Sequence, residues 1–299
     1  MQRSLLAAGL LACAAASQAA LPEGAGQYVY RDADGGEVPV YYYVPPGAAP
    51  GAPVVLVLHG LQRDAGQYRD GWIEAAGRHG LTVLAPLFTR ERFRGANGYQ
   101  LGNVFHAQTD DEIRGRARPA RSNPPSDWSF ALPDAVFRDF TRRQPAAPAG
   151  YTLYGHGAGA QFAQRYALFR PHSLACRIIA ANPGWYTFPD REIEWPYGLK
   201  GVGLLDDAAL DAALGAPLLL MLGEEDTSRG GVIRVTEGAD AQGADRKARG
   251  ENFFAYGQAL AARRGVPSGW RLQAVAGAGH RNAEMVDAVA AAIQHCPAP

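Results

Sequence analysis

Short apolar runs recur along the chain and alternate with stretches of helical periodicity. The run at 54–58, Val-Val-Leu-Val-Leu, is apolar on both faces, as strands are when helices cover both sides of a parallel sheet. The predicted strands of this sheet are 54–58, 81–85, 151–154, 178–181, 217–222 and 272–275. The predicted helices are 68–78, 131–143, 160–169, 251–264 and 282–295. This alternation predicts an α/β fold with a doubly wound, mostly parallel sheet.

Two Tyr-rich segments come before this alternation. Residues 27–31 and 38–44 flank the sequence DADGG at 32–36, which has the composition of a tight turn. Together they predict an N-terminal antiparallel hairpin.

The beginning of the chain has the composition of a secretory signal peptide. Arg3 precedes an apolar run at 5–16 that is too short to span a bilayer, and Ser-Gln-Ala at 17–19 fits a cleavage site. We therefore expect residues 1–19 to be removed, residues 20–299 to form a single α/β domain, and the protein to be secreted or periplasmic. A lipoprotein anchor at Cys13 is the alternative interpretation.

Cleavage after Ala19 would leave two cysteines, Cys176 and Cys296. In an oxidising compartment they could form a disulfide that ties the C-terminal helix to the sheet, or they could remain separate buried thiols. Both interpretations stay open.

The charge balance and the residue spacing bear on partners and cofactors. Lys+Arg and Asp+Glu both number 29, so the net charge gives no reason to expect nucleic acid or an anionic membrane as a partner. A small or neutral ligand fits this balance better. The histidines show no clustered metal-ligand spacing, and the glycines at 155, 157 and 159 lack the spacing of a dinucleotide loop. We therefore expect neither a metal nor an organic cofactor.

The sequence YTLYGHGAGAQF at 151–162 combines a buried strand, a sharp turn and the start of a helix. A turn this tight needs glycine on both sides of its centre, because Cβ atoms there would collide with the neighbouring strand and helix. Gly155 and Gly159 meet that need, and the backbone N–H of Ala158 would face a ligand at the helix N-terminus. The centre of such a turn usually carries a nucleophile, but here it is Gly157, which has no side chain.

Two further strand ends carry acidic and imidazole groups. The strand at 217–222 leads to Glu225 and Asp226; Asp226 is the predicted partner of an imidazole, and Glu225 is the substitute. The strand at 272–275 leads through small residues to His280. The chain order of turn, acid and histidine is that of an α/β-hydrolase triad.

A fourth strand end completes the pattern. The run at 54–58 is followed by His-Gly and then by Leu61 and Gln62. The backbone N–H of Leu61 or Gln62 would join that of Ala158 to stabilise a developing oxyanion.

These motifs resemble those of the secreted α/β-hydrolases grouped with polyhydroxyalkanoate depolymerases and feruloyl-esterase-like enzymes. The resemblance rests on VVLVLHGLQRDAGQYRDGW at 54–72, YTLYGHGAGAQFAQRYALF at 151–169, AANPGWYTFP at 180–189, ARGENFFAYGQAL at 248–260 and AGAGHRNAEM at 276–285. It implies an α/β-hydrolase fold and ester hydrolysis through a Ser-His-Asp triad with no cofactor. Asp226 would be the acid and His280 the base.

Segments 91–130 and 184–214 fit the alternation of strands and helices poorly. In open α/β sheets, the loops at the carboxyl ends of the strands form the ligand crevice, so we expect these segments to form walls of a binding cleft. Trp185 and Tyr186 are candidate contacts for a small or polymeric ester substrate.

The sequence departs from the family pattern at Gly157, where the attacking hydroxyl is missing. No nearby serine lies in a comparable turn, and His156 is expected to point away from the pocket. Three hypotheses follow. The chain is a variant or inactive form of a secreted esterase, or a natural pseudoenzyme that binds an ester, polyester or aromatic acid without turnover. In the third, it is a weak hydrolase in which His280, oriented by Asp226, activates water.

Overall fold

The computed structural model describes residues 19–144, 146–230, 232–293 and 295–296. Residues 1–18 of the predicted signal peptide, including Cys13, lie outside the described residues. No helix formed by the described residues combines the length and the apolar composition that a membrane crossing requires.

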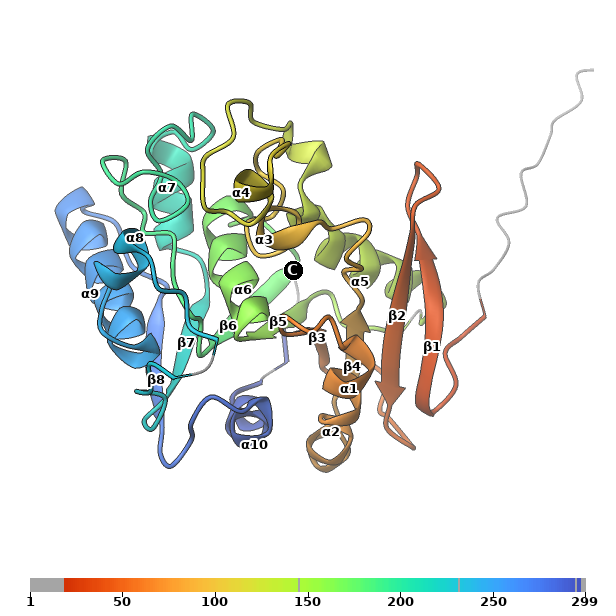
Figure 1. Cartoon of the computed structure of the whole chain (residues 1–299). Helices are drawn as coiled ribbons and strands as arrows, with labels where there is room; N and C mark the ends of the chain where they lie inside the picture. Colours follow the sequence, from red (N-terminus) through yellow and green to blue (C-terminus); the bar gives the residue numbers. More distant parts are fainter. Residues whose placement is uncertain (1–18, 145, 231, 294, 297–299) are drawn as a thin grey trace, which may run out of the picture.

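An eight-stranded sheet runs through the protein in the order β1-β2-β4-β3-β5-β6-β7-β8 (Figure 1). The strands are β1 (Gly24–Arg31), β2 (Glu37–Val44), β3 (Val54–Leu58), β4 (Thr82–Pro86), β5 (Tyr151–His156), β6 (Ala175–Ala181), β7 (Leu218–Gly223) and β8 (Arg271–Val275). β2 pairs antiparallel with both β1 and β4, and the remaining pairs are parallel. The structure therefore confirms the predicted sheet and its N-terminal hairpin.

Helices cover both faces of this sheet. α1, α2 and α10 lie on one face, and α5, α6, α7 and α9 lie on the other (Figure 1). The helices are α1 (Ala65–Asp70), α2 (Ile73–His79), α3 (Gly95–Gly98), α4 (Asp110–Ile113), α5 (Leu132–Arg143), α6 (Ala158–Phe169), α7 (Asp207–Leu214), α8 (Glu237–Asp240), α9 (Arg246–Arg264) and α10 (Asn282–Ala292), with 3-10 turns η1 (Pro125–Asp127) and η2 (Ser129–Ala131). Each face of the sheet therefore has its own hydrophobic core.

The helices differ from the prediction in several places: α9 begins at Arg246 and not at 251, and α3, α4 and α8 were not predicted. The helix predicted at 68–78 is in fact two helices, because α1 ends at Asp70 and α2 begins at Ile73. α7 lies within 184–214, which the sequence pattern assigned to a loop. The side chain of Asp206 caps α7 by accepting a hydrogen bond from the backbone of its first turn, which is a local signal of a helix start.

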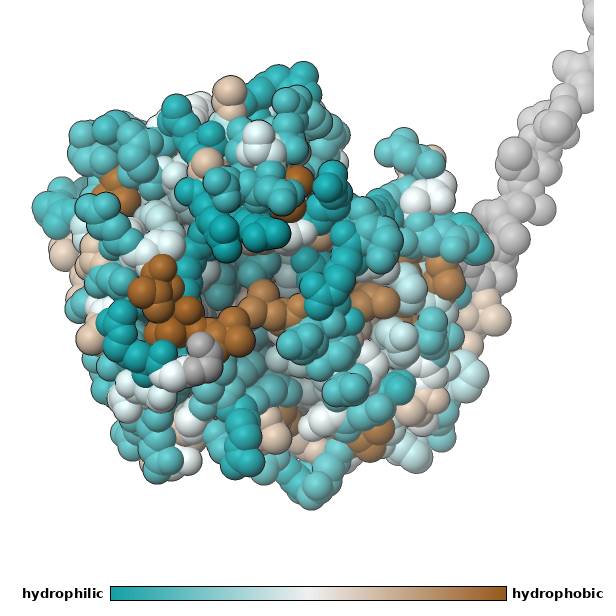
Figure 2. Space-filling view, in the orientation of Figure 1, coloured by the Kyte–Doolittle hydropathy of each residue, from teal (hydrophilic) through white to brown (hydrophobic). Residues whose placement is uncertain are grey.

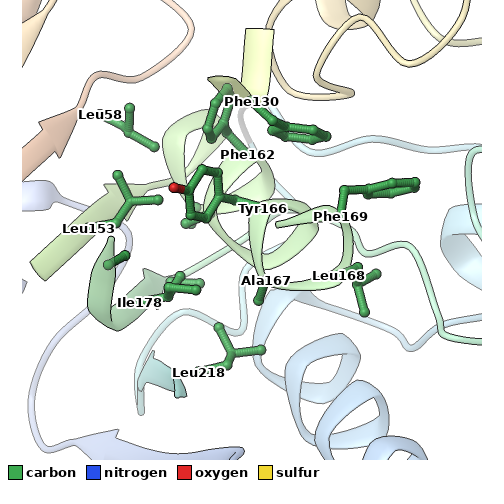
Figure 3. Close-up of a cluster of buried hydrophobic side chains, with 14 of the residues drawn as sticks. Leu58, Phe130, Leu153, Phe162, Tyr166, Ala167, Leu168, Phe169, Ile178 and Leu218 are labelled. Atoms are coloured by element: carbon green, nitrogen blue, oxygen red, sulfur yellow. The ribbon is translucent and has the colours of Figure 1, made fainter. Parts of the chain in front are cut away.

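α6 is buried along its whole length. Its aromatic side chains Phe162 and Phe169 pack against Phe130, with ring centroids 4.8 and 5.7 Å apart (Figure 3). Leu153 of β5 and Ile178 of β6 belong to the same core (Figure 3). Because this core surrounds the helix, the N-terminus of α6 is fixed at the point where β5 ends.

Glycines at the junction of β5 and α6 let one backbone touch another. A Cβ on Gly155 would lie 2.2 Å from the carbonyl oxygen of Gly159, and a Cβ on Gly159 would lie 2.4 Å from that of Leu58. Both distances are too short for any side chain, so β3, β5 and α6 can meet only with glycine at these positions. The structure confirms the reason for which the sequence predicted a tight strand-to-helix turn here.

The two cysteines form a disulfide, which settles the choice that the sequence left open. Cys176 in β6 is bonded to Cys296, with their Cα atoms 5.6 Å apart and a sequence separation of 120. The bridge attaches the segment after α10 to the sheet. It closes a long loop, and such a closure stabilises a fold chiefly by restricting the unfolded chain.

We predict that Cys296→Ser lowers the free energy of unfolding by about 2–5 kcal/mol, because the unfolded chain regains the freedom that the bridge removes. Urea denaturation of the oxidised protein and of the variant measures the difference. A reducing agent should lower the free energy of unfolding of the wild type to that of the variant, and it should not change the stability of the variant. Equal stability of the oxidised wild type and Cys296→Ser would contradict the prediction.

Candidate active site

Gly157 forms the turn between β5 and α6 in a backbone conformation that suits glycine. Its φ and ψ are 56° and −108°. Its N–H donates to the carbonyl of Ala181 at 3.1 Å, and its carbonyl accepts from the N–H of Gln161 at 3.1 Å. A residue with a side chain would be strained at this φ, and turns that present a nucleophile carry such strain. The backbone of the predicted turn is therefore in place although the side chain is absent.

The space beside Gly157 faces an imidazole. A Cβ built on Gly157 would lie 3.7 Å from Nε2 of His280, at ordinary van der Waals contact. A serine hydroxyl lies one bond beyond Cβ, so the rotamer turned toward His280 would bring it within hydrogen-bond reach of that nitrogen. The position has room for the missing group.

Asp226 holds the other side of the imidazole. Its Oδ2 is 2.8 Å from Nδ1 of His280. Asp226 is buried just after β7, and its Oδ1 accepts a hydrogen bond from Nη1 of the buried Arg246 at 3.2 Å. Glu225 is exposed. Of the two predicted acids, the structure therefore places Asp226 on the histidine, with a guanidinium to balance its charge.

Asn182 joins the loops that carry the acid and the histidine. Its side-chain amide donates to the carbonyl of Gly279 at 2.8 Å, and its side-chain oxygen accepts from the N–H of Gly223 at 2.8 Å. Gly223 ends β7 ahead of Asp226, and Gly279 precedes His280. Asn182 thus fixes the distance between the two loops. The sequence prediction missed it, because nothing local distinguishes an asparagine after a strand as a link of this kind.

His156 does not point away from the pocket, so that expectation was wrong. Its ring lies 5.1 Å from the ring of His280, and its Nδ1 is 3.4 Å from the hydroxyl of Tyr68 in α1. Strand alternation puts His156 on the same face of the sheet as Tyr154, toward α1. Burial, with smaller effects from His280 and Arg246, lowers the pKa of His156 to about 3. The imidazole next to His280 is therefore neutral.

A buried histidine fixes the loop after β3. Nδ1 of His59 contacts the carbonyl of Gly60 at 3.0 Å, and Nε2 accepts from the N–H of Phe88 at 3.0 Å. The hydroxyl of Tyr99 donates to the carbonyl of His59 at 2.7 Å. Both ring nitrogens are thus used in the neutral form, with Nδ1 donating. Burial accordingly lowers the pKa of His59 to about 3.

The predicted oxyanion donors gather around one hollow. Leu61, Gln62 and Ala158 line it together with Gly157 and His280. Ala158 is the first residue of α6, so its N–H has no acceptor within the helix. This placement suits an anion, and the role of these amides remains a prediction.

This elbow hollow has a volume of about 370 Å³. It is lined by Gly60, Leu61, Gln62, Asp64, Tyr68, His156, Gly157, Ala158, Gln161, Gly184, Val232, Arg246, His280 and Asn282. A larger side cleft of about 530 Å³ adjoins it and shares Leu61, Gln161, Gly184 and Val232 with it. Figure 2 shows this face hollowed near its middle.

The walls of the side cleft come partly from the segments that the sequence predicted. Segment 91–130 contributes Arg114 and Arg116 among others, and segment 184–214 contributes Trp185. Residues 232–236 also line the cleft and were not predicted. Their sequence shows neither strand nor helix periodicity, so only their position after the β7 loop indicates a place near the site.

The two predicted aromatic contacts, Trp185 and Tyr186, have different environments. Trp185 lines the side cleft, where its ring is stacked between the guanidinium groups of Arg165 and Arg234. Tyr186 is fully buried and lines neither hollow; its ring stacks on Phe253 with centroids 4.6 Å apart. The structure therefore does not support Tyr186 as a substrate contact.

No group of three or more His, Cys, Asp or Glu side chains in the described chain has an arrangement that would hold a metal ion.

The chain is similar to solved structures of hydrolases, although no protein-family profile and no curated protein matches it. Poly(aspartic acid) hydrolase-1 from Sphingomonas sp. KT-1 is 32% identical, with a TM-score of 0.83 over 91% of this chain and 98% of that one. LpqC, a poly(3-hydroxybutyrate) depolymerase from Bordetella parapertussis, is 34% identical, with a TM-score of 0.81 over 90% of each chain. The siderophore hydrolase EstB from Aspergillus nidulans, 16% identical with a TM-score of 0.51 over 94% of this chain and 98% of that one, shares the fold alone. These comparisons confirm the predicted α/β-hydrolase fold.

We predict that acid destabilises the fold through His59 and His156. Both pKa values are lowered to about 3, so below the ordinary value of about 6.5 the unfolded chain binds protons that the folded chain does not. Stability should therefore fall as the pH drops from 6.5 toward 3, by about 2 kcal/mol per histidine at pH 5. Urea denaturation at pH 7 and pH 5 measures the loss.

Substitution of single histidines tests whether the pH dependence of stability comes from His59 and His156. His59→Gln should remove about 2 kcal/mol of the difference between pH 7 and pH 5, since glutamine does not titrate. The exposed His172 offers a matched control, and His172→Gln should keep the full difference. An unchanged pH dependence in both His59→Gln and His156→Gln would refute the prediction.

We also predict that a side chain at position 157 costs stability. Gly157→Ala should lower the free energy of unfolding by about 1–3 kcal/mol, because alanine is strained at a φ of 56° although its Cβ has room. Thermal or urea denaturation measures this. Gly203→Ala is the control, since nothing lies within 4 Å of its Cβ position and no positive φ is involved. A Gly157→Ala protein as stable as the wild type would show that the turn is unstrained.

Proposed function

Because the chain belongs to the depolymerase-like group of the α/β-hydrolase family, we propose that its elbow hollow is an acyl-binding site of an esterase that lacks its nucleophile. One observation carries this proposal: His280, held by Asp226, faces the Cβ position of Gly157 at 3.7 Å. A Ser-His-Asp triad needs just this relation of base and acid to the nucleophile. The base and the acid of such a triad are therefore in position, and only the hydroxyl of the nucleophile is absent.

The surroundings of the pair support a hydrolytic origin. Arg246 balances the charge of Asp226, and Asn182 holds the acid loop to the histidine loop. Leu61 and Ala158 border the same hollow, where their amides would stabilise a tetrahedral oxyanion. With a serine at 157, His280 would take its proton as the hydroxyl attacks the ester carbonyl and would return that proton to the leaving group.

Without the serine, we expect binding with little turnover. The oxyanion donors and the hollow remain, and such remnants give an acceleration of about 10³–10⁴ over water when a triad member is missing. A natural pseudoenzyme that binds its ligand in this hollow is the second candidate. The open space beside His280 favours it, because the imidazole is not blocked by another side chain.

The disulfide supports the proposal that the protein works outside the cytoplasm. Bridges such as Cys176–Cys296 persist in oxidising compartments, as expected for a secreted or periplasmic protein.

We predict that Gly157→Ser raises kcat/KM for short p-nitrophenyl esters by at least about 10³-fold, because the restored hydroxyl completes the triad. The same variant should be labelled by a fluorophosphonate probe, and the wild type should not. Gly157→Ala is the matched control, since it carries the same backbone strain without a hydroxyl and should stay inactive. The double variant Gly157→Ser/His280→Ala should lose the gain.

Two outcomes would overturn the proposal. One is a folded Gly157→Ser protein, with a cooperative unfolding transition, that neither labels nor hydrolyses any ester of the panel. The other is wild-type turnover that survives His280→Ala unchanged, which would place the chemistry elsewhere.

A further inference from the structure

The side cleft is strongly cationic in a chain whose total charge is balanced. Five arginines line it, namely Arg63, Arg90, Arg114, Arg116 and Arg234, and its described lining includes no acidic residue. Lys+Arg and Asp+Glu both number 29 in the whole chain, so this concentration is local. The expectation of a neutral ligand, which was based on the total charge, therefore does not apply to this cleft.

Three of these arginines have no carboxylate partner among the described residues. Arg63 donates to the backbone carbonyls of Phe93 and Gly95. Arg90 donates to the carbonyl of Leu61 at 3.0 Å, and Arg234 donates to the carbonyl of Gly115. Backbone carbonyls orient a guanidinium but do not neutralise it. The positive charge of Arg90 and Arg234 therefore remains available to a ligand, and that of Arg63 is offset only in part by Glu91.

The other two arginines are only weakly paired. Arg114 lies 3.7 Å from Asp110, and Arg116 lies 3.7 Å from Asp111. Both pairs are solvent-exposed, and exposed pairs of this kind contribute little. Their guanidinium groups can turn to a better acceptor at small cost.

Behind Trp185, which lines the side cleft, lies a buried arginine without a carboxylate partner among the described residues. Trp185 is stacked between Arg165 and Arg234, whose guanidinium carbons lie 4.0 and 4.3 Å from the ring centroid. Arg165 is fully buried, and its Nη2 has no hydrogen-bond partner. Burial and the charge of Arg234 hold the pKa of Arg165 well below its usual range. An anion in the cleft would relieve this repulsion.

The side cleft leads to the elbow hollow and has an apolar edge. Leu61 and Val232 line both hollows, so a ligand can extend from one into the other. Val232 and Val235 are 77% and 63% exposed. Figure 2 shows a band of hydrophobic residues at the hollow, below hydrophilic ones. The elbow hollow is lined by Asp64 and by Arg246, whose charge is paired with Asp226, so the arginines without an ion pair line only the side cleft.

We propose that the side cleft binds carboxylate groups on the chain of an acyl substrate whose ester carbonyl lies at the elbow. Guanidinium groups bind carboxylates in bidentate pairs, and the valines suit the methylene segments between charged groups. The substrate class is therefore carboxylate-bearing esters and not neutral polyesters. This inference rests on the proposed function, because it places the reacting carbonyl beside Gly157.

The test compares two esters of equal acyl length on Gly157→Ser. Mono-p-nitrophenyl adipate carries a terminal carboxylate, and p-nitrophenyl hexanoate does not. We expect kcat/KM to favour the adipate by at least about tenfold at low salt, and this preference to shrink in about 0.5 M NaCl, where charges are screened. Arg114→Gln/Arg116→Gln, added to Gly157→Ser, should lower this preference, and Arg234→Gln added to both should lower it further.

Controls separate charge from structure. Arg138→Gln removes an exposed arginine of α5 that does not line the cleft, and it should keep the full preference. Arg234→Gln should lower the preference too, whereas Arg234→Lys should keep part of it, because lysine retains the charge without the planar fork.

The outcomes distinguish this inference from the proposed function. Equal rates on both esters, unaffected by salt, would overturn the inference and leave the esterase site standing. If Gly157→Ser hydrolyses neither ester, the proposed function fails, and calorimetry on the unmodified chain decides the inference. A blocked tetra-glutamate peptide should then bind at least tenfold more tightly than tetra-glutamine, and Arg114→Gln/Arg116→Gln should reduce the difference. Equal binding of the two peptides would overturn the inference.

Discussion

The site depends on a contact between backbones. β3, β5 and α6 approach so closely at Gly155 and Gly159 that no side chain fits at either position. This approach fixes the start of α6 over the end of β5 and forces the chain at position 157 into a positive φ. The direction in which residue 157 faces is therefore set by the backbone packing on either side of it and not by the side chains of the site. The turn keeps its shape whether or not the residue at its centre carries a nucleophile.

The charged and titratable groups near the site differ in how their charges are compensated. Asp226 is buried but balanced by Arg246 and His280, so its charge is tolerated where an isolated carboxylate would not be. His59 and His156 are buried without such partners, and their low pKa values keep them neutral. The side cleft differs, since no acidic residue lines it and its arginines are either without an ion pair or only weakly paired with exposed carboxylates. Charge is thus satisfied internally at the triad positions and left for a ligand next to them.

Much of the fold and part of the site could be predicted from sequence. Strands buried on both faces give unbroken apolar runs, and a turn that requires glycine shows its glycines, so β5, α6 and the loops with Asp226 and His280 were found. His156 was misplaced because local spacing does not show that α1 closes over that face of β5. Asn182 and the arginines of the side cleft were missed because their roles come from residues distant in sequence. The total charge of the chain also gave no sign of the cleft arginines, because acidic residues elsewhere cancel their local excess of positive charge.

The loop that carries His280 is anchored at both ends. β8 enters it from the sheet, α10 leaves it with Met285 and Val289 in the core, and Gly279 within it is bonded to both Asn182 and Glu284. None of these anchors involves residue 157. The imidazole is consequently preorganised whatever stands opposite, so the pocket keeps its shape with glycine at position 157. Under the proposed function, activity at such a site would disappear and return through one substitution, with no intermediate that has to rebuild the loop.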